Sequence, residues 1–179
     1  MNPTVMDRIW YWLKLVVVAV MLVFIIRGFL LIPMTVDGIS MEPTLQADDH
    51  IVYEKISSIN RFDVVIFQMP NGNTYIKRVI GLPNEKIAYK NDKLYVDGKE
   101  VAEPFLGKQK IKRTSTHYTT NFDSEEILEQ PAISENAYFV LGDNRRLSKD
   151  SRSFGEVDAK YVVGKARFIY YPLFHIKWL

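Results

Sequence analysis

A serine in a bent segment is the first residue of this chain that could act as a nucleophile. Ser40 lies within the octet GISMEPTL, residues 38–45. Gly38 permits backbone angles that a Cβ would forbid, and Pro43 fixes its own φ and biases Glu42 away from a helix. Activated nucleophiles are often displayed on such rigid turns, but an ordinary turn with a solvated serine has the same pattern. The octet alone leaves both interpretations open.

A nucleophilic serine needs a base, and a lysine further along the chain is one candidate. Residues 74–81 carry Lys77 and Arg78 side by side among apolar residues, and strand alternation places these two side chains on opposite faces. Arginine stays protonated in proteins, whereas a desolvated lysine can lose its proton. Lys77 is therefore a candidate general base, and Arg78 a candidate partner for a carboxylate. The alternative for Lys77 is an edge-strand lysine that discourages aggregation.

A histidine base is the second possibility, because the members of a serine–histidine–carboxylate triad meet in space and not in sequence. The chain has three histidines, at positions 50, 117 and 175. None of them lies in a turn-rich, polar cluster like that around Ser40. We therefore expect each to be a surface or core residue.

A third polar cluster, residues 142–155, directly follows an expected strand. It combines hydroxyl, carboxylate and guanidinium groups, which can build a rigid loop through charge-assisted hydrogen bonds. A serine in this loop could orient a neutral lysine amine, although a charged surface loop would have the same composition. The pairs that could form are Asp143 with Arg145 or Arg78, and Asp150 with Arg152.

The composition limits the kinds of site and partner. The chain has 179 residues and a formal net charge of +2, and the residues beyond position 33 are neutral overall. A neutral domain argues against nucleic-acid binding, which usually requires a basic surplus. The absence of cysteine excludes disulfides, thiolate nucleophiles and cysteine-based zinc sites. We expect no nucleic-acid partner, no metal and no cofactor.

An almost wholly apolar run, Ile9 to Ile32, precedes the serine segment. Its uninterrupted centre is shorter than the ~20 residues of a typical span. However, Lys14 and Arg27 near its ends could reach the lipid headgroups, and residues 10–12 resemble an aromatic belt. No Ala-x-Ala-like cleavage pattern follows, which favours an uncleaved anchor over a signal peptide. Basic residues at its start favour a cytoplasmic N-terminus, so residues 1–33 are expected to be a cytoplasmic tail and single-pass membrane anchor.

After this run, short apolar stretches separated by turn signals predict a mainly β domain with little helix. Asn71-Gly72 and Asp97-Gly98 are hairpin signals, and Asp123 with Glu126 resembles a helix N-cap and its partner. Residues 102–136 are expected to form a smaller inserted loop or flap, because their first part is polar and contains a basic run. Expected strands cover residues 50–54, 63–67, 74–80, 86–89, 93–96, 99–101, 137–141, 161–163 and 166–171.

Together, these segments resemble those of bacterial type I signal peptidases, the membrane-bound Ser–Lys proteases of serine protease family S26 that remove signal peptides from secreted preproteins. The resemblance covers most of the chain. It includes the apolar run, the Ser40 octet, residues 61–65, residues 75–83 and the loop 142–155, in the family's order. It implies an antiparallel two-sheet, signal-peptidase-like (LexA-like) β domain at residues 34–179. That domain would lie outside the bacterial cell membrane, with a lipid bilayer and signal peptides as partners.

The resemblance also implies roles for single residues. Ser40 aligns with the nucleophile, Lys77 with the general base and Ser148 with the serine that positions the lysine. Gly38 stands where some members carry a serine that stabilises the oxyanion, as in the Gram-positive branch, so only the backbone N–H of Ser40 is assigned there. Arg146 stands where several relatives have aspartate. The positions that align with the family's salt-bridged supporting loop are Asp143, Arg145, Asp150 and Arg152.

The implied reaction is acyl transfer, in which Ser40 forms an ester that a lysine-activated water hydrolyses. The family cuts after small residues. Two alternatives stay open: a non-enzymatic, membrane-tethered β-domain that binds a partner, and a self-cleaving Ser–Lys domain of the repressor type. The latter class normally carries a DNA-binding module where this chain has an apolar run.

Overall fold

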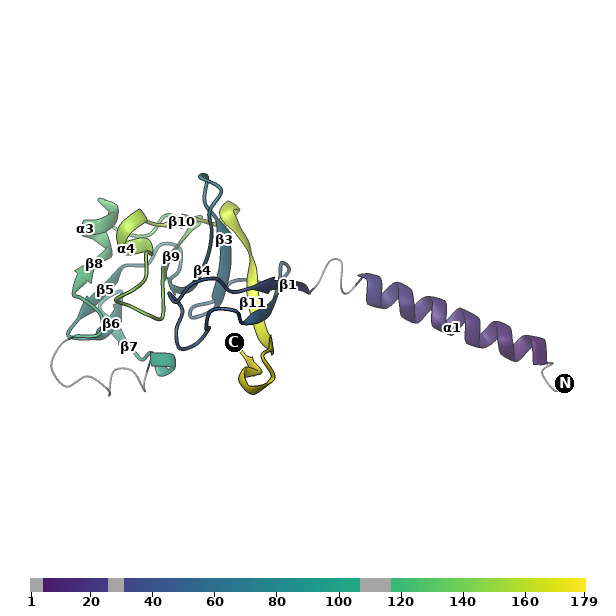
Figure 1. Ribbon diagram of the computed structural model, residues 1–179. Coiled ribbons are helices and arrows are strands. Elements are labelled where there is room, and N and C mark those ends of the chain that lie inside the picture. Colours follow the sequence, from purple (N-terminus) through teal and green to yellow (C-terminus); the bar gives the residue numbers. More distant parts are fainter. Residues whose placement is uncertain (1–4, 26–30, 107–116) are drawn as a thin grey trace.

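The computed structural model describes residues 5–25, 31–106 and 117–179. Two antiparallel sheets form the β body (Figure 1). The larger sheet has the order β1-β2-β11-β3-β4-β9-β10, with β12 paired to β11. Its strands are β1 Ile32–Thr35, β2 His50–Glu54, β3 Val64–Gln68, β4 Thr74–Gly81, β9 Ala137–Leu141, β10 Val157–Asp158, β11 Val162–Tyr171 and β12 Lys177–Trp178.

The smaller sheet has the order β7-β6-β5-β8. Its strands are β5 Ile87–Lys90, β6 Lys93–Val96, β7 Lys99–Val101 and β8 Phe122–Asp123. Beside α1, Val5–Ile25, the described helices are short: α3 Ser124–Leu128, α4 Ser151–Phe154, and the 3-10 turns η2 Pro104–Leu106, η3 Ala159–Tyr161 and η4 Leu173–His175. The predicted mainly β architecture with two antiparallel sheets and little helix is confirmed.

The turn chemistry explains most of the hairpins. Asp97 and Gly98 both have positive φ, as a tight turn between β6 and β7 requires. Asn91 and Asp92 form a second such turn, between β5 and β6, where the sequence has no Asn-Gly or Asp-Gly pair. Asp123 caps α3 by accepting a hydrogen bond from the Glu125 backbone, as predicted for this position.

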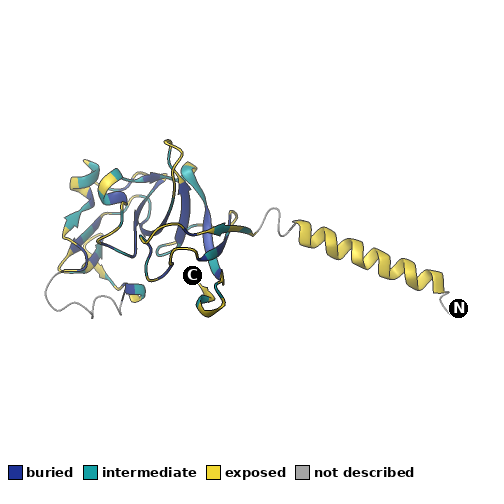
Figure 2. Ribbon diagram, viewed as in Figure 1, coloured by how far each residue is buried: buried dark blue, intermediate teal, exposed yellow. Residues whose placement is uncertain are grey.

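Three apolar clusters fill the body, and two of them support the segments discussed below. The buried residues, dark blue in Figure 2, lie mostly on the strands. In the first cluster, Met41 and Leu45 pack with Val36, Ile51 and Ile66, so the residues on either side of the Ser40 turn are anchored in the core. The second joins the two sheets through contacts among Ile80, Phe139 and Leu141 of the larger sheet and Ile87 and Leu94 of the smaller one.

The described part of the N-terminal apolar run up to Ile25 belongs to α1, and the side chains of residues 5–24 are exposed (Figure 2). Asp7, Arg8 and Lys14 interrupt its apolar sequence. Across the described ranges, no helix combines the length and the apolar character that crossing a membrane demands. The predicted transmembrane span is therefore not supported. The end of the run, Ile32 and Pro33, belongs instead to β1, where it pairs with β2.

The predicted insert is only partly a solvated loop. Its basic run, Lys108 to Arg113, lies outside the described residues. The flanking residues Glu103, Leu106, Tyr118 and Thr119 are buried, and β8 and α3 follow them. Polar composition suggested exposure here, but Glu103 and Thr119 accept hydrogen bonds from Arg145, and Tyr118 donates to the Asp143 carbonyl, so these three side chains contact the loop after β9.

Candidate active site

Ser40 lies in the connection between β1 and β2, in a segment held from two sides. Gly38 has a φ of +80°, the left-handed conformation that a glycine at this position permits. Core packing holds the residues after the serine, and the Leu45 backbone N–H donates to the Met41 carbonyl over 3.0 Å. The Ser40 carbonyl accepts from the backbone N–H of Asn144, also over 3.0 Å. The serine is thus fixed between the core and the loop that follows β9.

Lys77 lies on β4, an inner strand between β3 and β9. It is 2% exposed, which excludes the alternative of a solvated edge-strand lysine. Its Nζ lies 2.7 Å from Ser40 Oγ and 3.0 Å from the Ile76 carbonyl oxygen. The structure thus brings together the two residues that the sequence proposed as nucleophile and base.

The surroundings of Lys77 favour its neutral form. Burial lowers the pKa of Lys77 to about 8, because desolvation penalises the ammonium. The carboxylates of Asp150 and Asp143 act in the opposite direction and limit this lowering of the pKa. A substantial fraction of Lys77 is therefore unprotonated near pH 8, which a general base requires.

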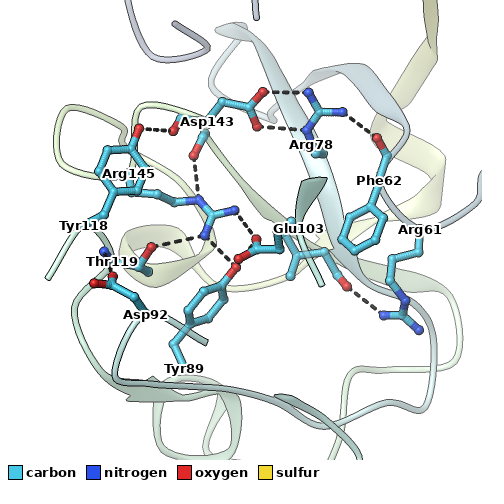
Figure 3. Close-up of polar contacts among 12 residues, drawn as sticks. Arg61, Phe62, Arg78, Tyr89, Asp92, Glu103, Tyr118, Thr119, Asp143 and Arg145 are labelled. Atoms are coloured by element: carbon cyan, nitrogen blue, oxygen red, sulfur yellow. Dashed lines mark hydrogen bonds and ion pairs between the residues drawn. The ribbon is translucent and has the colours of Figure 1, made fainter. Parts of the chain in front are cut away.

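Asp143 pairs with Arg78, which resolves the choice that the sequence left open (Figure 3). Arg78 Nε and Nη2 donate to the two Asp143 carboxylate oxygens over 2.8 and 2.6 Å. Its Nη1 donates to the Phe62 carbonyl over 2.7 Å, and its guanidinium lies 4.1 Å from the centre of the Phe105 ring. This buried bidentate pair ties the strand that carries Lys77 to the loop after β9.

Asp150 and Arg152 form the other ion pair proposed for this loop. Arg152 Nε and Nη2 each donate to the Asp150 carboxylate over 2.8 Å. Asp150 also caps α4 and accepts from the Gly142 backbone N–H over 3.0 Å. Arg152 Nη2 reaches the Arg145 carbonyl as well, over 2.6 Å. This pair closes the loop between Gly142 and the start of α4.

Arg145 is buried and points away from Asp143 toward the smaller sheet (Figure 3). Its Nη2 pairs with Glu103 Oε1 at 2.5 Å, and its Nη1 donates to Tyr89 Oη and Thr119 Oγ1 over 2.5 and 3.2 Å. Sequence reasoning missed Glu103, Tyr89 and Thr119. Nothing in the polar stretch around Glu103 distinguishes a buried carboxylate from a solvated one.

Ser148 has a buried hydroxyl for which the described part of the chain provides no hydrogen-bond partner. A Cβ added at Gly142 would collide with this hydroxyl and with the Ser40 carbonyl oxygen. Ser148 therefore lies against Gly142 on the same side as Ser40. Its predicted role in orienting Lys77 is not expressed as a hydrogen bond and stays a prediction.

The three histidines contact other groups. His50 packs against the rings of Tyr170 and Tyr171. His117 Nδ1 lies 3.3 Å from Asp92, and His175 Nδ1 lies 2.9 Å from Asp49. None of the hydrogen bonds found among the described residues joins a histidine to Ser40, so the geometry favours lysine as the base. Among those same residues, no group of acidic residues and histidines could hold a metal ion.

A serine hydroxyl beside a buried lysine whose pKa is lowered, on a two-sheet β fold, defines a candidate hydrolase with a serine nucleophile. Comparison with known proteins gives this class a family. The family described as "Signal peptidase, peptidase S26" matches residues 9–171. This chain belongs to that family, and the predicted assignment to the signal peptidases, serine endopeptidases that remove signal peptides, is confirmed at this level.

Individual relatives agree with the family assignment. The chain is 43% identical to signal peptidase I of Bacillus caldolyticus over 169 residues, which cover 92% of this chain and 91% of the relative. It is 42% identical to signal peptidase I V of Bacillus subtilis over 158 residues, covering 86% and 94%. A crystal structure of a signal peptidase I from Enterococcus faecalis superposes with a TM-score of 0.59 at 39% identity, covering 62% of this chain and 98% of that one.

Proposed function

We propose that this chain removes signal peptides from secreted preproteins, with Ser40 as the nucleophile and Lys77 as the general base. The observation that carries this proposal is the 2.7 Å separation of Lys77 Nζ from Ser40 Oγ in a buried setting that lowers the lysine pKa to about 8. Neutral Lys77 takes the proton from Ser40 Oγ as the oxygen attacks the scissile carbonyl. The ester that results is hydrolysed by a water that Lys77 deprotonates.

The neighbouring residues have supporting roles in this proposal. The Ser148 hydroxyl, buried and unpaired within the described chain, is suited to orient the Lys77 amine. The backbone N–H of Ser40 is proposed to stabilise the oxyanion. The ion pairs of Asp143 with Arg78 and of Asp150 with Arg152 hold the loop that brings Ser148 to Ser40. The substrate is proposed to bind as an extended strand, with small residues before the cleaved bond.

Incubation of the purified chain with a preprotein tests the proposal directly. The wild-type chain should release the mature protein, and N-terminal sequencing should place the cut after a small residue. Ser40→Ala should lower the rate by at least about 10³-fold, because a covalent intermediate can no longer form. Ser58→Ala, at an exposed serine outside the site, should cleave like wild type.

Two outcomes of that experiment would support the rival functions. Stable binding of the preprotein without cleavage would indicate a non-enzymatic binding domain. Progressive shortening of the chain itself, with no effect on the preprotein, would indicate a self-cleaving domain. Intact-mass measurement of the enzyme during the reaction separates the second outcome from true turnover.

We further propose a lipid bilayer as a partner, with the chain before β1 as the attachment and the β domain from Ile32 onward outside the bacterial cell. The exposed apolar side chains of α1 support this, because a helix with no covered face needs an apolar environment. At the other end of the chain, Phe174 and Trp178 are 87% and 78% exposed. Trp178 also lines a pocket with Leu31, close to where the attachment segment enters the β body.

Protease treatment of intact cells tests this topology. Protease added outside should degrade the chain from β1 onward and leave a protected N-terminal fragment, because the bilayer shields only the attachment segment. The same treatment after lysis should degrade both parts. A β domain that survives in intact cells and is cut only after lysis would contradict the proposed location.

A further inference from the structure

A buried carboxylate, that of Glu103, links the smaller sheet to the loop beside the candidate active site. Glu103, between β7 and η2, has a side chain that is fully buried together with that of Arg145. Tyr89, on β5, bridges the pair, since its hydroxyl donates to Glu103 Oε1 and accepts from Arg145 Nη1. Thr119 accepts from the same guanidinium nitrogen. Four residues from separate segments thus share one charged network (Figure 3).

Arg145 connects this network to the loop after β9. Its Nε donates to the Gly142 carbonyl over 3.1 Å, while the Gly142 N–H is held by Asp150 over 3.0 Å. Both polar groups of the Gly142 residue are therefore fixed by charged side chains. Gly142 in turn lies against the Ser148 hydroxyl and the Ser40 carbonyl so closely that a Cβ would collide with both. A shift of Gly142 toward these groups would therefore press on Ser148 and on the Ser40 backbone.

A buried ion pair is a costly way to join two sheets. Desolvation offsets much of the attraction, and apolar side chains of similar size are often as stable or more so. The pair does give direction, because the planar guanidinium has donors in a fixed fork. With Glu103 and Tyr89 fixing the two terminal nitrogens, Nε can point only toward the Gly142 carbonyl. The arrangement thus provides orientation that an apolar contact cannot.

We propose that Glu103 is a positioning residue for the Ser40–Lys77 pair, acting through Arg145 and Gly142. This inference rests on the proposed function of that pair. The proposal assigns to the smaller sheet a role in fixing the positions of Ser40 and Ser148 relative to each other. Glu103 acts on geometry and not on the charge of Lys77, since the carboxylates that influence the lysine are Asp150 and Asp143.

The deciding variant replaces the network by apolar side chains: Glu103→Met, Arg145→Met and Tyr89→Phe together, in the full-length chain. Because the carboxylate and the guanidinium that pair with each other are removed together, its melting temperature should stay within a few degrees of wild type. We expect kcat to fall about 10- to 100-fold with KM nearly unchanged, because small displacements at a reacting pair cost this much. The midpoint of the rising pH–rate limb should not move. A folded triple variant with wild-type kcat would overturn the proposal.

The single variant Glu103→Gln tests the positioning role of Glu103 if the triple variant does not fold. Its activity is measured well below its own melting temperature, and wild type is measured at the same temperature. Glu100→Gln is the control, since Glu100 forms an exposed ion pair with Lys93 in the same sheet. We expect kcat per folded molecule to drop for Glu103→Gln and to stay unchanged for Glu100→Gln. A loss of activity that only follows the unfolded fraction would overturn the inference.

Hydrogen exchange gives a reading that does not depend on activity. In the Glu103 variants, exchange should rise in peptides that cover residues 38–45 and 142–148, because positioning is lost there. Changes confined to residues 86–106 would show that Glu103 stabilises only its own sheet. If exchange responds as expected but the wild-type chain cleaves no preprotein, the proposed function fails while the structural coupling stands.

Discussion

Lys77→Met is expected to abolish proteolysis while leaving the chain folded and, at pH 7, more stable than wild type. Turnover should fall by at least about 10³-fold, since no other base lies within hydrogen-bonding distance of Ser40 Oγ in the described structure. The gain in stability follows from the buried amine. Its pKa is lowered from 10.5 to about 8, which corresponds to a cost of up to about 3 kcal/mol when the native lysine carries its proton.

The size of this gain in stability depends on pH. Below pH 8 the lysine is protonated in both the native and the unfolded state, so the native state carries the full cost of the buried charge. Between about pH 8 and 10.5 only the unfolded state binds the proton, and this group makes wild type more stable as pH rises. The advantage of Lys77→Met should therefore be largest at neutral pH and decline toward pH 10.5. Urea unfolding at several pH values measures it, and a variant less stable than wild type at pH 7 would contradict the assignment.

The same lysine should set the pH dependence of activity. The rate should rise with pH through a midpoint near 8, and Lys77→Arg should be inactive because it keeps the charge but cannot act as a base. Replacing His50, His117 and His175 together should leave this rising limb in place. A triple histidine variant without activity, beside an active Lys77→Arg variant, would point to a histidine base.

Asp143→Asn is expected to cost about 3–5 kcal/mol of stability, the range for breaking a buried ion pair from one side. Arg78 is buried and pairs with Asp143 through two hydrogen bonds, so the variant leaves a guanidinium in the interior without its carboxylate. Asp143 also raises the pKa of Lys77. Whatever fraction remains folded should show its rising pH–rate limb shifted below pH 8.

Glu125→Gln is the control for this prediction. Glu125 pairs with Lys86 on the surface, where both side chains are about half exposed. Water and salt screen such a pair, so its loss should change the free energy of unfolding by less than about 1 kcal/mol. Equal losses in Asp143→Asn and Glu125→Gln, measured by urea unfolding, would mean that burial does not strengthen the Asp143–Arg78 pair.

The strands that carry the site could be predicted because local patterns specify them. Alternation placed Lys77 and Arg78 on opposite faces of one strand, and Asn-Gly and Asp-Gly turns marked two hairpins. β1 was missed because the apolar run of α1 continues into it without a turn signal, so composition alone gave no boundary. The pairing of β1 with β2 depends on contacts between distant residues.

The partners of the loop residues could be predicted only in part. The adjacent pair Asp150 and Arg152 follows from short spacing. The partner of Asp143 was left open, because the choice of Arg78 depends on the β4–β9 register, in which Arg78 lies opposite Leu141. Glu103 gave no signal, since a carboxylate buried against an arginine has the same composition as one in a solvated loop. Long-range pairing, and not residue type, decided these positions.

The order of strands in the larger sheet has a consequence for synthesis of the chain. Ser40 is attached to the ribbon β1–β2 and Lys77 to the ribbon β3–β4, and the strand between these ribbons is β11. β11 is synthesised after both ribbons, since Val162–Tyr171 follow them in the sequence. A nascent polypeptide therefore carries both reactive side chains on ribbons that are not yet joined. We therefore expect Ser40 and Lys77 to be held together only in chains long enough to include β11.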